Sequence, residues 1–100
     1  MGNPDKHIAL SDLQIAVVRV LWQHGECSVA DVAQALDATR GLKHTTVATV
    51  LTRLRNRGVV GQRREGRQLM YRALVSESQV RRSMVAELVG NLFGDSQTRQ

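Results

Sequence analysis

One segment of the chain, residues 45–56, combines side chains that could read base edges with side chains that could hold phosphates. Its apolar residues recur at the i, i+3, i+4, i+7 spacing of a helix: Val47, Val50, Leu51 and Leu54. On a helical wheel the opposite face is uncharged and rich in hydroxyl groups. That face is formed by Thr45, Thr49, Thr52 and Asn56, with Thr46 and Arg53 along one flank.

This arrangement suits a helix inserted into the major groove of duplex DNA, which is about 12 Å wide. There a threonine can present its hydroxyl or its methyl group to a base edge, while Arg53 binds a flanking phosphate. The backbone N–H groups of Thr45 and Thr46 also favour a phosphate, and His44 could touch DNA beside them. The alternative is a face that is only solvated. Threonine is a mediocre helix former, so four threonines within eight residues favour insertion.

The positive charge of the chain is concentrated around this segment. Nine of the fourteen Lys and Arg residues lie between Arg40 and Arg72, and Glu65 is the only acid among them, so this window carries +8. The whole chain carries +5, because residues 1–39 are net negative and residues 73–100 are neutral. A basic block one third of the chain long predicts a surface that binds a polyanion, above all nucleic acid.

The basic block continues into a predicted β-hairpin. Two strands, 59–64 and 68–74, are expected to be joined through Glu65-Gly66. The basic residues that flank the turn are Arg63, Arg64 and Arg67. Such a tip could track a phosphate strand or enter a minor groove. Charge that only protects an edge strand from aggregation is the alternative. We favour phosphate contact because the hairpin follows directly on the basic helix.

Two helices are predicted before this segment. Ser11 and Gln14 form a capping box for the first, which is expected to run to about His24. Ser28 caps a second, shorter helix that is expected to end before residue 39. A polar-faced third helix after two short helices predicts a helix-turn-helix.

A final helix is predicted after the hairpin, opened by a capping box of Ser76 and Gln79 and running to about residue 93. The expected fold is mainly α with a small β-hairpin: a winged helix-turn-helix with a three-helix core, a two-stranded wing and a C-terminal helix. The expected organisation is a flexible N-terminus at 1–9, a winged-helix DNA-binding domain at 10–75, a C-terminal helix for dimerisation or linkage at 76–94, and a frayed tail at 95–100.

The first helix is apolar on two sides, so it needs a second cover from either the final helix or another subunit. The final helix carries an apolar stripe of its own. The side chains available for a dimer interface are Ile15, Val18, Trp22, Val85, Leu88, Val89 and Leu92.

Several other functions find no support in the sequence. The three histidines and the single cysteine, Cys27, have no metal-ligand spacing, and there is no nucleophile elbow or Gly-rich phosphate loop. We therefore expect no enzyme activity, no metal and no cofactor. Cys27 is expected to be a small, partly buried residue beside the second helix. No apolar run is long enough to span a bilayer and nothing resembles a secretory signal, so a cytoplasmic protein is expected.

The chain resembles the penicillinase-repressor family of bacterial transcriptional regulators (BlaI/MecI/CopY type). The similarity covers nearly all of residues 10–93, and its most specific part is the run TTVATVLTRLRNRGVV at 45–60. The runs LSDLQIAVVRVLW at 10–22 and REGRQLMYRAL at 64–74 are similar to the family as well.

The resemblance implies a homodimer that binds a palindromic operator and represses transcription. It also implies that Thr45, Thr46, Thr49 and Arg53 face the operator, with Lys43 at the start of their helix and the three hairpin arginines in the wing. Family members usually continue past residue 100 with helices that intertwine two subunits. The cleavable Asn-Phe bond of penicillinase-type repressors is matched here by Glu87-Leu88, and the cysteine cluster of the copper-responsive branch is missing, so neither proteolytic control nor copper sensing is expected.

The sequence therefore predicts a sequence-specific DNA-binding regulator whose partners are double-stranded DNA and a second copy of the chain. Two alternatives stay open. The first is a winged-helix module that binds another protein, which the two-sided first helix and the final helix would support. The second is a sequence-neutral DNA binder, which would bind every duplex equally and with a steep salt dependence.

Overall fold

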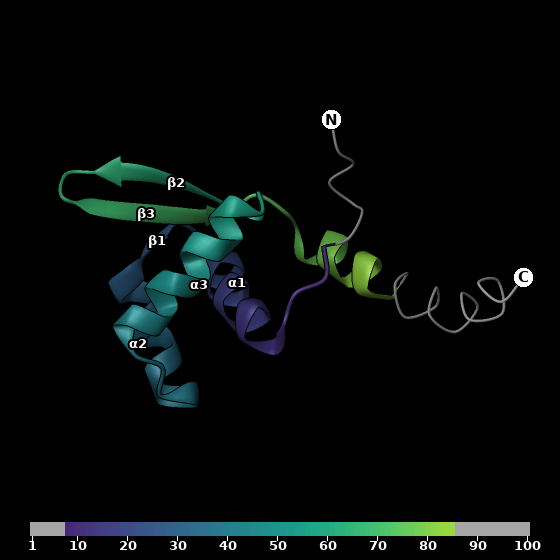
Figure 1. The fold of residues 1–100 in the computed structure, drawn as a ribbon, viewed down its shortest axis with the longest axis horizontal. Coiled ribbons are helices and arrows are strands. Elements are labelled where there is room, and N and C mark those ends of the chain that lie inside the picture. Colours follow the sequence, from purple (N-terminus) through teal and green to yellow (C-terminus); the bar gives the residue numbers. More distant parts are fainter. Residues whose placement is uncertain (1–7, 86–100) are drawn as a thin grey trace, which may run out of the picture.

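The computed structural model describes residues 8–85, apart from the side chains at positions 38 and 39. Its elements follow the order α1, β1, α2, α3, β2, β3, and residues 77–85 form a further helical segment. Figure 1 shows α1, α2 and α3 gathered together, with the β2–β3 hairpin projecting beyond them. The architecture is the predicted winged helix-turn-helix.

Helix α1 (Asp12–His24) begins and ends where the sequence indicates. Ser11 and Gln14 form the predicted capping box, in which each backbone N–H donates to the other residue's side chain at 3.1 Å. Gly25 ends the helix with a φ of 80°, and its N–H donates to the carbonyl of Leu21.

Helix α2 (Val29–Arg40) is longer than predicted. Ser28 caps it, and Asp31 completes a reciprocal capping box with Ser28. The helix passes the expected stop before residue 39, because the first residue able to close it is Gly41. Gly41 adopts the left-handed conformation, and its N–H reaches the carbonyls of the last helical turn. Helix α3 (His44–Asn56) then begins after three linking residues.

The sheet contains a strand that the sequence analysis missed. Strand β1 (Cys27–Ser28) pairs antiparallel with β3 (Gln68–Ala73), which also pairs with β2 (Val60–Glu65), giving the order β1-β3-β2. The expected two-stranded wing is therefore the larger part of a three-stranded sheet. The hairpin turn also lies one residue further on than expected: Glu65 pairs with Gln68, so Gly66 and Arg67 form the turn.

One core cluster joins all of these elements. Its fully buried side chains are Val17, Val18, Val32, Val47, Leu51, Leu54 and Val60. Ile8 is buried as well, so the folded domain begins before the expected boundary at residue 10. Val75 and Val80 are buried in the same cluster. The first turns of the C-terminal helical segment therefore belong to the domain core, and the expected boundary at residue 75 cuts through packed structure.

Ser76 and Gln79 form the predicted capping box at the start of the C-terminal helical segment. The expected end of that helix, near residue 93, lies outside the described residues. Close by, the indole N–H of Trp22 donates to the carbonyl of Val75 at 2.9 Å, which ties α1 to the chain that follows β3.

Candidate nucleic-acid interface

Helix α3 presents the predicted polar face to solvent. Its apolar stripe is buried, with Val47, Leu51 and Leu54 at 0% exposure, and this fixes the rotation of the helix. The polar side chains that are exposed as a result are Thr45, Thr49, Thr52, Arg53 and Asn56. Thr46 is half-buried on the flank of this face. No described element covers the threonines, so α3 is free to approach a ligand with this face.

Thr49 has a more restricted chemistry than its neighbours. Its hydroxyl donates to the carbonyl of Thr45, one helical turn earlier, at 3.0 Å. The hydroxyl proton is thus engaged inside the helix. Thr49 can still offer oxygen lone pairs as an acceptor and a methyl group for apolar contact, which are the groups that suit an amino group or a thymine methyl in the major groove.

The N-terminus of α3 differs from those of α1, α2 and the C-terminal helical segment. Those three begin with a side-chain capping box, whereas Lys43 stands at the N-cap of α3 without a side-chain hydrogen bond, and the first turn contains no acid. The backbone N–H groups at 44–46 are therefore open to an anionic ligand. Lys43 and His44 are both exposed beside them.

The arginines of the basic block are placed in different surroundings. Arg53 is exposed at the edge of the threonine face and makes no ion pair within residues 8–85. Arg57, just after α3, instead donates to the carbonyl of Ala9 at 3.0 Å and to Oε1 of Gln14 at 3.3 Å. Arg57 thus anchors the segment before α1 to the end of α3.

In the wing, the three predicted arginines do not behave alike. Arg63 Nε and Nη2 donate to both carboxylate oxygens of Glu26, at 2.7 and 2.6 Å, and Nη2 also reaches Glu65 at 2.9 Å. Arg63, which the sequence predicts to contact phosphate together with Arg64 and Arg67, is thus already paired with two carboxylates. Arg64 and Arg67 are exposed and have no ion pair within the described segment.

Glu26 is the residue that sequence reasoning missed at this surface. The Arg63 guanidinium lowers the pKa of the Glu26 carboxyl, chiefly through their hydrogen bond, and Arg72 lowers it further by its charge. The same contact raises the pKa of Arg63. The two residues are 37 positions apart and meet only because β1 joins the sheet. No local spacing in the sequence carries that information.

The residues predicted for a dimer interface also differ in their exposure. Val18 is completely buried inside one chain, and Ile15 and Trp22 are partly buried against the same core. Its own chain thus covers Val18 fully and Ile15 and Trp22 in part, where the sequence left the cover open between the final helix and another subunit. Val85, by contrast, is 53% exposed. Leu88, Val89 and Leu92 lie outside the described residues.

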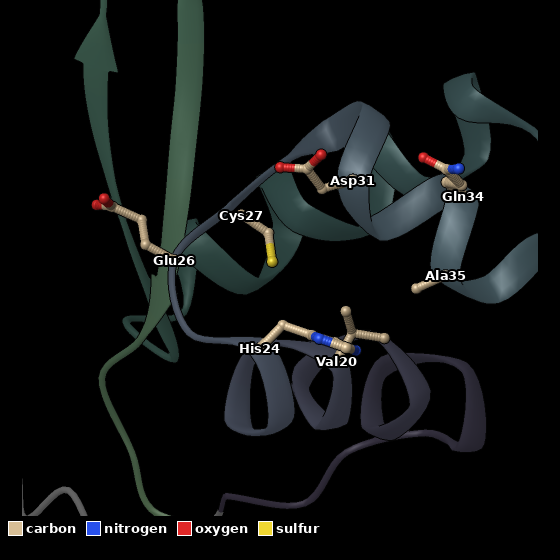
Figure 2. Close-up of a pocket in the computed structure, with 7 residues that line it drawn as sticks. All are labelled: Val20, His24, Glu26, Cys27, Asp31, Gln34 and Ala35. Atoms are coloured by element: carbon tan, nitrogen blue, oxygen red, sulfur yellow. The ribbon is translucent and has the colours of Figure 1, made fainter.

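A groove of about 370 Å³ lies between α1 and α2, lined among others by Val20, His24, Cys27 and Asp31 (Figure 2). Cys27 is buried there, as its predicted place beside α2 implies, and its Sγ donates to the carbonyl of Gly25 at 3.3 Å. Burial raises the pKa of the Cys27 thiol, and the charge of Asp31 raises it further, so the thiol is a poor nucleophile. Within residues 8–85 no group of acidic, histidine and cysteine side chains could hold a metal ion. In the same part of the chain no helix is long and apolar enough to cross a bilayer.

The fold and the exposed face of α3 define a winged helix-turn-helix protein. Within that class, the chain belongs to the penicillinase repressor family, whose model matches residues 10–99. It is 30% identical over 69 residues to the penicillinase repressor of Bacillus licheniformis, covering 69% of this chain and 54% of that protein. It is 44% identical over 63 residues to the transcriptional regulator BlaI of Mycobacterium tuberculosis, covering 62% and 46%.

Solved structures give the same assignment. The solution structure of the DNA-binding domain of the repressor BlaI is similar with a TM-score of 0.65 and 31% identity, over 74% of this chain and 92% of that one. The monomeric form of Bacillus licheniformis BlaI in complex with the blaP half-operator is similar with a TM-score of 0.63 and 30% identity, over 74% and 90%. The chain spans about half the length of the curated relatives it matches.

Proposed function

We propose that this chain binds duplex DNA and acts as a transcriptional repressor in the cytoplasm. Its family membership supports this function, since the relatives include a penicillinase repressor and the similar structures include BlaI with a half-operator. DNA binding accounts for a concentrated basic block in a chain whose described residues offer no metal site.

The observation that carries the proposal is the exposed threonine face of α3. The buried stripe at Val47, Leu51 and Leu54 holds that face away from the core. A helix of this kind fits the major groove, where Thr45 and Thr49 sit in its N-terminal half and reach base edges. Arg53, about one turn beyond Thr49, meets the phosphates that border the groove.

The proposal includes a homodimer on a palindromic operator. Two copies related by a twofold axis place two α3 helices about 10 base pairs apart, or a multiple of that spacing. Val85 is an exposed apolar side chain on the C-terminal helical segment, and it offers a starting point for contact between the copies.

Selection of bound sequences from a random duplex library tests the proposal directly. The expected result is an enriched, twofold-symmetric site whose half-sites are spaced by whole helical turns. Tight binding without enrichment would instead identify a sequence-neutral DNA binder with a steep salt dependence. No binding to any duplex, even at low salt, would overturn the proposal and favour a module that binds protein.

A further inference from the structure

The face of the sheet opposite to the one that packs against the helices is called the outer face. It carries a charge cluster that reaches from the residue before β1, across β3, to β2. Glu26 immediately precedes β1, Arg63 lies on β2, and β3 runs between them. The two-pronged contact between their side chains, at 2.6 and 2.7 Å, therefore reaches across the central strand. Figure 2 shows that Glu26 points away from its neighbour Cys27, which faces the groove between α1 and α2.

The shape of the sheet makes room for this cluster. Arg72 of β3 pairs with Gly61 of β2, and both border a shallow hollow of about 190 Å³ together with Glu26 and Arg63. A Cβ atom at Gly61 would lie 3.4 Å from Nε of Arg72 and 3.2 Å from Cδ2 of Leu74. Glycine at this position thus leaves space for arginine side chains to lie along the sheet.

Side chains alternate between the two faces along β2, so Arg64 lies on the face opposite to Arg63. Gln62 and Arg64 share the face on which Tyr71 of β3 is buried, and this is the side that packs against the helices. Arg67 lies in the hairpin turn itself. The two carboxylates that hold Arg63 therefore neutralise only the outer face, and the inner face and the tip keep their charge.

We propose that Glu26 is a positioning residue of the wing, which holds Arg63 on the outer face and so leaves phosphate contact to Arg64 and Arg67. This inference rests on the proposed DNA-binding function. To reach a phosphate, Arg63 would give up a two-pronged carboxylate contact and expose two acids to a polyanion. The same contact links the residue before β1 to β2 across the central strand.

The first test compares three arginine variants of the full chain. All variants are measured against the same labelled duplex, which has one arbitrary sequence and is about 30 base pairs, or three helical turns, long. Binding is followed by fluorescence anisotropy at several salt concentrations. Arg64→Gln and Arg67→Gln should each flatten the slope of log K against log salt by about 0.9, the value for one phosphate contact. Arg63→Gln should leave the slope unchanged. A loss for Arg63→Gln equal to that for Arg64→Gln overturns the inference.

The second test asks whether Glu26 is the cause. In a Glu26→Gln background, Arg63 loses its two-pronged contact and keeps only the single contact with Glu65, so adding Arg63→Gln should now flatten the slope by up to about 0.9. A purely structural or additive charge effect predicts the same change from Arg63→Gln in both backgrounds, and that result refutes the role of Glu26. Glu77→Gln is the matched control, because it removes the same group from an exposed pair with Arg81 on the C-terminal helical segment.

The two proposals fail in different ways. If the unmodified chain binds no duplex at any salt concentration, the proposed function is wrong and the wing has no phosphate to contact. If the chain binds but the three arginines contribute equally, DNA binding stands and the positioning role of Glu26 is wrong. Thermal melts of every variant show whether the fold is intact, and the first test needs no change at position 26.

Discussion

Replacing Arg53 by alanine should weaken duplex binding and flatten its dependence on salt. Arg53 lies in the last turn of α3, exposed at the edge of the threonine face. It makes no ion pair within residues 8–85, so its full charge is available to a phosphate. Because the side chain is exposed, its removal leaves the core of the domain intact.

The magnitude follows from the number of exposed cations that we assign to phosphate contact. Four contacts per chain, from Lys43, Arg53, Arg64 and Arg67, correspond to a slope of log K against log salt of about −3.6. Raising the salt from about 50 to 200 mM should then weaken binding by the unmodified chain about 150-fold. Arg53→Ala, with three contacts left, should lose only about 40-fold over the same range.

The assay is anisotropy of a labelled duplex across this salt range, with a thermal melt to confirm folding. Arg19→Ala is the matched control, because Arg19 is an exposed arginine that lines a groove between α1 and α2. It removes the same charge from another surface, so its slope should equal that of the unmodified chain. Equal slopes for Arg53→Ala and the unmodified chain would show that Arg53 does not contact phosphate and that the orientation assigned to α3 on DNA is wrong.

Further predictions concern stability, reactivity and assembly. Leu54→Ala should cost about 2–5 kcal/mol of unfolding free energy in urea titrations, since Leu54 is completely buried, and a loss below 1 kcal/mol would contradict that packing. Cys27 should react slowly with a thiol reagent until the chain unfolds, because burial raises its pKa and restricts access; fast labelling of folded protein would contradict this. Glu26→Gln should lower the urea midpoint at neutral pH. That difference should vanish as the pH falls through the lowered pKa of Glu26, because only the ionised carboxylate of the folded protein holds its arginine partner, and a constant difference would argue against an ionic origin. Val85→Asp should shift the proposed dimer to monomer in sedimentation without unfolding the chain, and an unaltered dimer would remove Val85 from the interface.

The helices could be predicted because their signals are local. Each capping box needs two residues three positions apart, and each apolar stripe needs only about two turns of chain. The boxes predicted at Ser11 and Ser76 both form, and Ser28 caps α2 as predicted, with Asp31 completing a box there that was not predicted. The buried stripe of α3 likewise fixed which threonines face outward, since a helix has one rotation once its core side is known.

Features that depend on distant pairing could not be predicted in the same way. Strand β1 has two residues, too few to show alternation, and one of them also caps α2. Without β1 there is no reason to place Glu26 near Arg63. Ile8 directly follows the polar stretch at 2–7, and only the packed core shows that it is buried together with Leu10. The cover over Val18 was left open between a helix of the same chain and a second subunit, because apolar patterning does not say which surface supplies the partner.

The cations of the basic block are therefore divided among different surfaces, which the composition of the block does not reveal. Its nine cations would give a slope of about −8 if all of them met phosphate. In the folded chain Arg57 anchors the segment before α1, while Arg63 and Arg72 lie on the outer face of the sheet with Glu26. Arg40 lines a groove between α1 and α2, away from the threonine face. At most five cations then remain for one duplex, when Arg55 at the other edge of α3 is counted, and the slope per chain should lie between about −3.6 and −4.5. A measured slope near −8 per chain would mean that Arg63 leaves its carboxylates on binding and that Arg40, Arg57 and Arg72 also reach phosphate, so the domain would have to rearrange on DNA.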